Sequence, residues 1–313
     1  MITPKPHGTL TGKEQLFADQ LLASFDRRWE RYRRDLGRCQ KKCSEEAVHD
    51  LRVASRRLLS TLEVVARVVD DNSVARFRQT LRRRLKVLGP LRDVQVQLLR
   101  LDKAREIHPE LEQFHTLLLL REKKLLKEIE RELKKTRVSL LEQHKREIRT
   151  QLPRVLQRVQ TQSAVKAVAI GGVAGGFLKA SALLVKVDPS DAATIHRLRV
   201  CFKKFRYDVE ALQHVLPGIT TGMLKAMNEY QTRMGLIQDL EVFSAAFRKY
   251  LSRARKGTHF GFLPFQQELT REHQSLVEKF LAGAGELNGF WTLGVAAERQ
   301  HKTTSSIHKS SLN

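Results

Sequence analysis

An internal repeat constrains this chain more than any other feature of its sequence. The block VHDLRVASRRL, which begins at Val48, returns 147 residues later as IHRLRVCFKKF, which begins at Ile195. A second pair of blocks follows at a displacement of 146 residues, with LGPLRDV from Leu88 and MGLIQDL from Met234. Because both blocks keep almost the same separation, we predict that one structural unit occurs twice in the chain.

The repeated unit is predicted to be helical. Long segments are rich in Leu, Glu, Lys and Arg, and the chain contains only 17 Gly and 8 Pro. Its 313 residues suffice for two helical domains, which we place at residues 11–152 and 153–285. The first half is expected to contain helices at residues 12–41, 44–69, 72–108 and 110–150, with a kink or boundary at Pro90. From residue 286 to 313 we expect a disordered tail.

Each copy of the first block forms two contrasting faces on a helical wheel. In the first copy the apolar residues share one sector and are Leu51, Ala54, Leu58, Leu62 and Val65. The opposite sector carries His49, Arg52 and Arg56. The second copy repeats this arrangement, with Leu198, Cys201, Phe205, Val209 and Leu212 opposite His196, Arg199 and Lys203. We therefore predict two helices that turn a matching row of cations away from their own cores.

Further cations extend this row. Arg57, Lys204 and Arg206 flank it, and Arg78, Arg82 and Lys86 recur every fourth residue on the next helix of the first half. The equivalent positions of the second half are Leu224, Asn228 and Thr232, so we expect the first half to be the more basic. Glu63 and Glu210 lie one turn past the cations of the two blocks, and we expect them to orient those cations.

The charge of the chain indicates a polyanionic partner. Lys and Arg number 57 against 34 Asp and Glu, which gives a formal charge of +23 that self-repulsion penalises. Guanidinium groups match phosphate oxygens in pairs, and a cation on every helical turn follows an extended anion better than a small one. The three cysteines are expected to be free thiols in the cytoplasm. The apolar run at residues 167–178 is too short to span a bilayer, and we read it as a closely packed or flexible segment, so no membrane span is predicted.

These blocks resemble the CHAD family, the conserved histidine α-helical domain, over residues 11–285. The resemblance implies an all-α fold of two pseudo-symmetric four-helix bundles from an internal duplication, with the two basic helices lining a central cleft. It also implies binding of inorganic polyphosphate at polyphosphate granules, where granule-associated proteins are further candidate partners. By position, the resemblance adds Arg121 and Arg271 to the binding residues named above.

Several other functions were weighed. A metal site or a metal-dependent phosphohydrolase needs carboxylates near the histidines, but arginines surround them and Asp50 becomes Arg197 in the repeat. Non-specific nucleic-acid binding is the stronger alternative, since any cationic surface attracts phosphates, although aromatic residues make up only 6% of the chain. A scaffold role at granules is compatible with binding. We therefore predict a binding protein, without catalytic residues, cofactor or metal.

Overall fold

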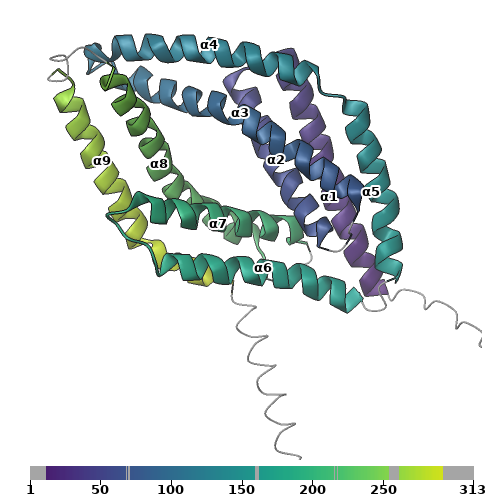
Figure 1. Cartoon of the computed structure of the whole chain (residues 1–313). Coiled ribbons are helices and arrows are strands. Elements are labelled where there is room, and N and C mark those ends of the chain that lie inside the picture. The colour runs from purple at the N-terminus through teal and green to yellow at the C-terminus, as the bar shows by residue number, and fades with distance from the viewer. Residues whose placement is uncertain are drawn as a thin grey trace, which may run out of the picture. The chain divides into compact units, whose positions relative to one another are not determined.

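Helix is the regular structure throughout the part of the chain that can be described. The computed structural model describes residues 12–67, 69, 71–158, 162–214, 216, 218–253 and 261–291, and these residues contain no strand. For residues 12–18, 155–158 and 162–166 the description is limited to the backbone. The predicted all-α class is confirmed (Figure 1).

The chain divides into two compact units, and each unit consists of three separate segments of the sequence. Unit 1 consists of the described parts of Met1–Asp102, His115–Gly171 and Tyr207–Gly218. Unit 2 consists of the described parts of Lys103–Phe114, Gly172–Arg206 and Ile219–Asn313. The predicted domain boundary at Pro153 lies inside unit 1, within a helix, so the compact units do not coincide with the sequence halves. The duplication of one bundle stays a prediction.

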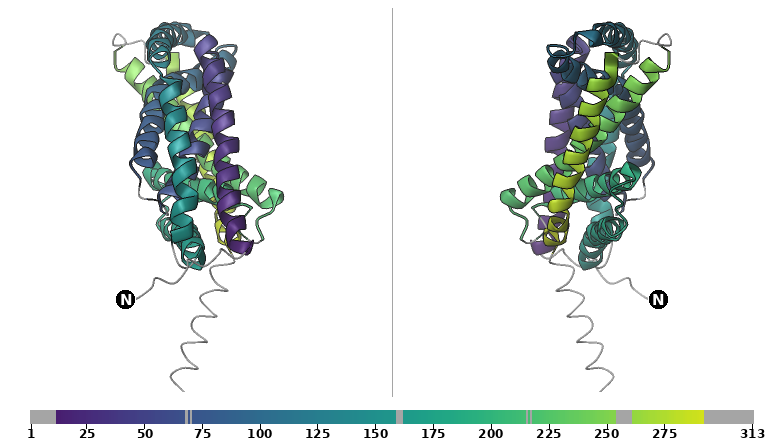
Figure 2. Two further views of the ribbon diagram at one scale, coloured as in Figure 1. Left: turned by 90° about the vertical axis from the view of Figure 1, so that its right-hand side faces the viewer. Right: turned by 90° about the vertical axis from the view of Figure 1, so that its left-hand side faces the viewer.

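Unit 1 is built on α1 (Gly12–Lys41), α2 (Glu45–Ala66), most of α3 (Asn72–Ala104), α4 (Glu112–Lys134) and α5 (Val138–Arg158). Helix α1 lies beside α2 and α5, and Figure 2 shows α1 and α5 side by side. Ser44 caps α2, because its hydroxyl accepts a hydrogen bond from the Ala47 amide at 3.2 Å. The core contains the buried rings of Phe25, Trp29, Tyr32 and Phe77.

Unit 2 contains most of α6 (Gln162–Leu184) and α7 (Ala192–Leu212), together with η1 (Pro109–Leu111), α8 (Thr221–Leu251), α9 (Leu263–Ala282) and η3 (Ala284–Phe290). Helices α8 and α9 pack against each other. The unit is rich in buried rings, which include Phe202, Phe205, Tyr230, Phe280, Phe290 and Trp291. These large side chains supply most of the core of unit 2.

The structure corrects three predicted boundaries. Helix α3 continues through Pro90, because Leu88 and Leu91 are fully buried on either side and hold the helix in the core of unit 1. The predicted helix over residues 110–150 is instead two helices, α4 and α5, separated near Thr136. The tail prediction is wrong for residues 286–290, which belong to η3 because Leu287 and Phe290 are buried. Residues 292–313 of the predicted tail lie outside the described residues.

The apolar run at residues 167–178 belongs to α6. Among the described residues this is the one helix that is long and apolar enough to cross a membrane, over Ala167–Leu184 with a mean hydropathy of 1.7. Only 22% of that window is buried. Most of this window is therefore not closely packed, which contradicts one of the two interpretations of the apolar run. Length and composition alone do not place the helix in a membrane, and the absence of a span stays a prediction.

Candidate functional site

Helix α2 presents the predicted two faces. The five apolar residues from Leu51 to Val65 are all buried, which confirms that this stripe faces the core of unit 1. On the other side, His49 and Arg57 are exposed, and Arg52 and Arg56 are partly exposed. The row of cations therefore reaches solvent while its carbon stems remain against the helix surface.

Arg52 is the most constrained cation of this row. Its Nη1 donates a hydrogen bond to the Leu85 carbonyl oxygen of α3 at 3.3 Å. It also lies above Gly89, where the position of a Cβ would be 3.7 Å from that nitrogen. Burial, and after it the charge of Arg56, lowers the pKa of Arg52 to about 10, while the charge of Asp93 opposes the effect. The side chain is still a cation at neutral pH, held in place by the backbone of α3.

His49 lies among positive charges. Partial burial lowers the pKa of His49, and the positive charge of Arg92 is the next largest cause. Arg56 and Arg52 act in the same direction, and Asp50 opposes them. Four cationic or protonatable side chains from α2 and α3 therefore converge within unit 1, and we call them the α2 cluster: His49, Arg52, Arg56 and Arg92.

Helix α7 carries the corresponding residues of unit 2. His196 is exposed, and its Nδ1 is hydrogen-bonded to the Oε1 atom of Gln238 on α8. Arg199 lies above Gly235, where the position of a Cβ would be 3.8 Å from its Nε. Lys203 is partly exposed and Lys204 is exposed. His196 and Arg199 therefore lie against α8, and the two lysines continue the basic row along α7.

A comparison with models of known protein families shows the family of this chain. The model of the CHAD domain matches residues 17–248, well over half of the chain. The chain belongs to the CHAD family. The crystal structure of the CHAD domain from the plant Ricinus communis is similar, with a TM-score of 0.61 and 17% sequence identity over 88% of this chain and 90% of that chain. At this identity the similarity concerns the fold alone. No curated protein matches the chain.

The two units of this CHAD protein contain matched contacts around their motif helices, α2 and α7. The arginine of each motif lies over a glycine of the following block, in the pairs Arg52–Gly89 and Arg199–Gly235. Each motif histidine is influenced by the residue three positions after that glycine. The charge of Arg92 lowers the pKa of His49, whereas His196 forms a hydrogen bond with the neutral amide of Gln238. The two histidines therefore occupy similar places with different electrostatics.

Arg92 is the functional candidate that the sequence-based site did not include. Its Nη1 forms an ion pair of 2.6 Å with Glu45 in the first turn of α2. The sequence did contain a sign of this role, because Arg92 belongs to the LGPLRD block that repeats with the histidine motif. What the sequence could not supply was the proximity of this block to His49.

The carboxylates of the site pair with cations of other helices. Glu63 pairs with Arg78 and, at 2.5 Å, with Arg82. Burial alone would raise the pKa of Glu63, but hydrogen bonds and charge from these two arginines outweigh it and lower the pKa. Glu63 therefore neutralises part of the predicted α3 stripe, in which Lys86 is exposed.

Glu210 belongs to unit 1, although it follows the second motif in the sequence. Its carboxylate lies 3.3 Å from the Nε of Arg57, and its carbonyl oxygen accepts a hydrogen bond of 2.6 Å from Arg28. Asp208, which is 2% exposed, accepts hydrogen bonds from Ser60 and Arg67. This polar seam attaches the end of α7 to α1 and α2, and it means that Arg57 is already partnered.

The remaining predicted residues differ in their accessibility. Arg206 is only 4% exposed, and its Nε donates a hydrogen bond to the Oε1 atom of Gln231 at 2.9 Å. It is therefore a structural residue of unit 2 in this conformation and not a surface cation. Arg121 on α4 and Arg271 on α9 are exposed, as a binding role requires. The Nε of Arg271 donates a hydrogen bond to the Gln267 carbonyl oxygen at 3.4 Å.

Proposed function

We propose that this CHAD protein binds inorganic polyphosphate through its two motif helices, without cleaving it, and that binding recruits it to polyphosphate granules in the cytoplasm. The observation that carries the proposal is the α2 cluster. Three arginines and a histidine from two helices converge there, and Asp93, Asp50 and Glu45 offset their charge only in part.

The physical basis is that folding already brings these cations together, at the expense of some stability of the free protein. Burial and mutual repulsion lower the pKa of Arg52 and of His49, so the charged forms of both side chains are disfavoured in the free protein. A polyanion relieves this repulsion and accepts charge-assisted hydrogen bonds from the guanidinium groups of the cluster. An extended chain of phosphates can in addition contact Lys86, which continues the basic row on α3.

We expect the second motif to contribute less to the binding free energy for polyphosphate than the first. His196 and Arg199 repeat the geometry of the first motif, but Gln238 replaces Arg92 and Arg206 is buried. We therefore expect the cluster of unit 1 to supply most of the binding free energy.

The test is calorimetric titration of the purified full chain with long-chain polyphosphate, single-stranded RNA and duplex DNA over a salt series. We expect polyphosphate to bind more tightly than either nucleic acid at physiological salt. The double variant Arg52→Gln with Arg92→Gln should weaken polyphosphate binding by at least about 100-fold, since charged hydrogen bonds contribute about 1.5–3 kcal/mol each. The matched control is Arg146→Gln with Lys249→Gln, which removes two exposed cations from α5 and α8.

Equal affinities for the three polymers would replace the proposal with general binding of phosphate backbones. Equal losses in the two double variants would show that only net charge matters, and would reject the α2 cluster as the site. Release of orthophosphate from polyphosphate during incubation would contradict a purely binding role.

A further inference from the structure

A cavity between α8 and α9 is not used by the proposed function. It lies within unit 2, has a volume of about 280 Å³ and is lined by residues of both helices. The lining residues of α8 are spaced as Glu241, Ser244 and Arg248, and those of α9 as Gln266, Thr270 and His273. Spacings of three, four and seven residues place each set on one face of its helix. These polar residues are half-buried or exposed, so the cavity lies beside the buried apolar residues of the two helices.

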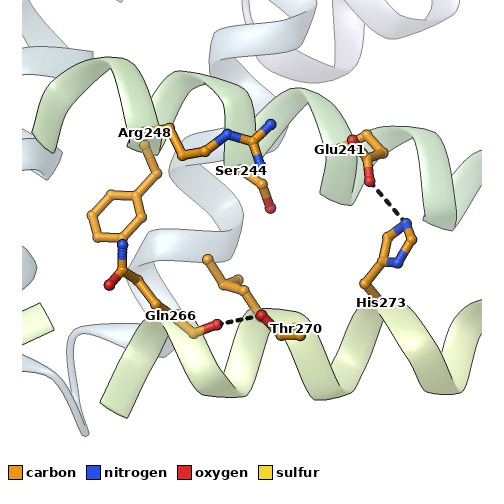
Figure 3. A pocket seen from close by; sticks show the side chains of 8 residues that line it. Glu241, Ser244, Arg248, Gln266, Thr270 and His273 are labelled. Carbon is orange, nitrogen blue, oxygen red and sulfur yellow. Dashed lines mark hydrogen bonds and ion pairs between the residues drawn. The ribbon is translucent and has the colours of Figure 1, made fainter. Parts of the chain in front are cut away.

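His273 explains why the cavity exists. The buried apolar series of α9 is Phe265, Leu269, Val277 and Phe280, and His273 occupies the place in this series where a further apolar residue is expected. Instead of filling the core, its Nε2 lies 2.8 Å from the Oε1 atom of Glu241 on α8. The imidazole is thus tied to one end of the cavity, and an interval of the helix interface is left unfilled (Figure 3).

The two ends of the cavity differ in charge. Figure 3 shows Glu241 and His273 at one end and Arg248 at the other, with Thr270 between them. Seven residues separate Glu241 from Arg248, which corresponds to about 10 Å along a helix. The Arg248 end is therefore cationic, whereas at the other end the carboxylate of Glu241 faces the imidazole of His273. The buried side chains of Phe247 and Leu269 supply an apolar surface along the cavity.

We propose that this cavity binds a small organic acid, with its carboxylate on Arg248 and its apolar body on Phe247 and Leu269. A guanidinium group pairs with a carboxylate through two parallel hydrogen bonds, and Ser244 and Gln266 offer further donors nearby. The volume is slightly below the range of about 300–1,000 Å³ typical of ligand pockets, which selects a compact ligand over a polymer. This site is independent of the polyphosphate proposal, because none of its residues belongs to the motif helices.

The test uses 3-phenylpropanoate as the probe, titrated calorimetrically into the full chain. Two matched compounds separate the contributions: 3-phenylpropanamide keeps the apolar body without the charge, and acetate keeps the charge without the body. We expect saturable binding of 3-phenylpropanoate, and binding of both matched compounds that is weaker by at least about tenfold.

Two variants and a control locate the binding. Arg248→Gln should weaken binding of the probe by at least about tenfold, whereas Lys249→Gln, the same charge change at the neighbouring exposed residue, should leave it unchanged. Thr270→Trp should abolish binding, because the bulky indole would occupy the middle of the cavity, with the helical circular dichroism retained. Undetectable binding to the wild-type chain, equal binding of the amide, or equal affinities of the Arg248→Gln and wild-type proteins would each overturn the proposal.

Discussion

Replacing Arg52 by methionine should separate the stability of the fold from its binding of polyphosphate. Methionine keeps an unbranched apolar stem of similar reach and removes the charge. In the folded chain the pKa of Arg52 falls from its ordinary value to about 10, chiefly because of burial. This lowering corresponds to about 3 kcal/mol of unfavourable free energy for the charged form in the folded protein, at about 1.4 kcal/mol per pKa unit.

The substitution also removes a favourable contact. The hydrogen bond from Arg52 to the Leu85 carbonyl oxygen is long, at 3.3 Å, so we place its contribution near the lower end of the range for charged donors, at about 1.5–2 kcal/mol. The two effects have opposite signs. We therefore expect Arg52→Met to raise the free energy of unfolding by about 1 kcal/mol while it weakens polyphosphate binding by at least about tenfold.

Arg84 provides the matched control. It lies on α3, likewise in unit 1, and burial lowers its pKa to about 10 as well. Its partners are Thr136, at 2.8 Å, and the ring of Tyr32, whose centroid lies 5.5 Å from the guanidinium carbon. None of these groups belongs to the α2 cluster. Arg84→Met should therefore leave the affinity for polyphosphate unchanged.

The assay is urea denaturation followed by circular dichroism at 222 nm, with and without polyphosphate. Wild-type protein should gain stability from polyphosphate, and the Arg52→Met variant should gain much less, because a ligand stabilises the folded state according to its affinity. Loss of 2 kcal/mol or more in the Arg52→Met protein without ligand would refute the electrostatic reasoning. An unchanged affinity in a folded variant would remove Arg52 from the binding site.

Three further outcomes follow from the structure. Because burial and Arg92 lower the pKa of His49 in the folded chain, Arg92→Gln should raise that pKa in an NMR titration, and an unchanged value would contradict the proximity of the two residues. The lowered pKa also means that protonation of His49 opposes folding, so the stability of Arg92→Gln relative to wild type should rise as the pH falls through about 6.5. Glu63→Gln should cost about 2 kcal/mol of stability at pH 7 by leaving two arginines without their carboxylate, and should increase polyphosphate affinity. Since the pKa of Glu63 is lowered, its stabilisation is lost as the pH falls through the folded value, so wild-type and Glu63→Gln proteins should converge in stability in acid, which denaturation at pH 3 and pH 7 checks. Asp208→Asn should destabilise the protein by about 3 kcal/mol, because it leaves Arg67 partly buried without its counter-charge, and thermal unfolding showing a loss below 1 kcal/mol would contradict this.

The features that sequence predicted well are those that depend on neighbours along the chain. Helix α1 begins and ends where its pattern predicts, at Gly12 and Lys41. The apolar stripe of α2 is buried and His49 is exposed, because the faces of a helix follow directly from its period of 3.6 residues. The all-α class and the CHAD family could likewise be recognised from local composition and from the spacing of the motifs.

The features that the sequence predicted poorly depend on contacts with residues that are distant in the sequence. A helical wheel placed Arg206 at the edge of a basic face, yet Gln231 of α8 covers it. Pro90 was expected to mark a kink or boundary, and the boundary is wrong because burial of Leu88 and Leu91 keeps α3 continuous through it. In both cases contacts from residues distant in the sequence outweigh the local preference.

The sequence by itself therefore determined that this chain is helical, that it repeats a His/Arg motif and that each motif has a basic face opposite an apolar one. Only the tertiary structure decided which charges remain available on those faces. Glu63 forms an ion pair with Arg78 of α3, and Glu210 forms one with Arg57 in unit 1. Arg92 lies close enough to His49 to lower its pKa. The physical reason is that periodicity fixes the direction of a side chain relative to its own helix, whereas electrostatic partners are chosen by helix packing, which brings together residues far apart in the chain.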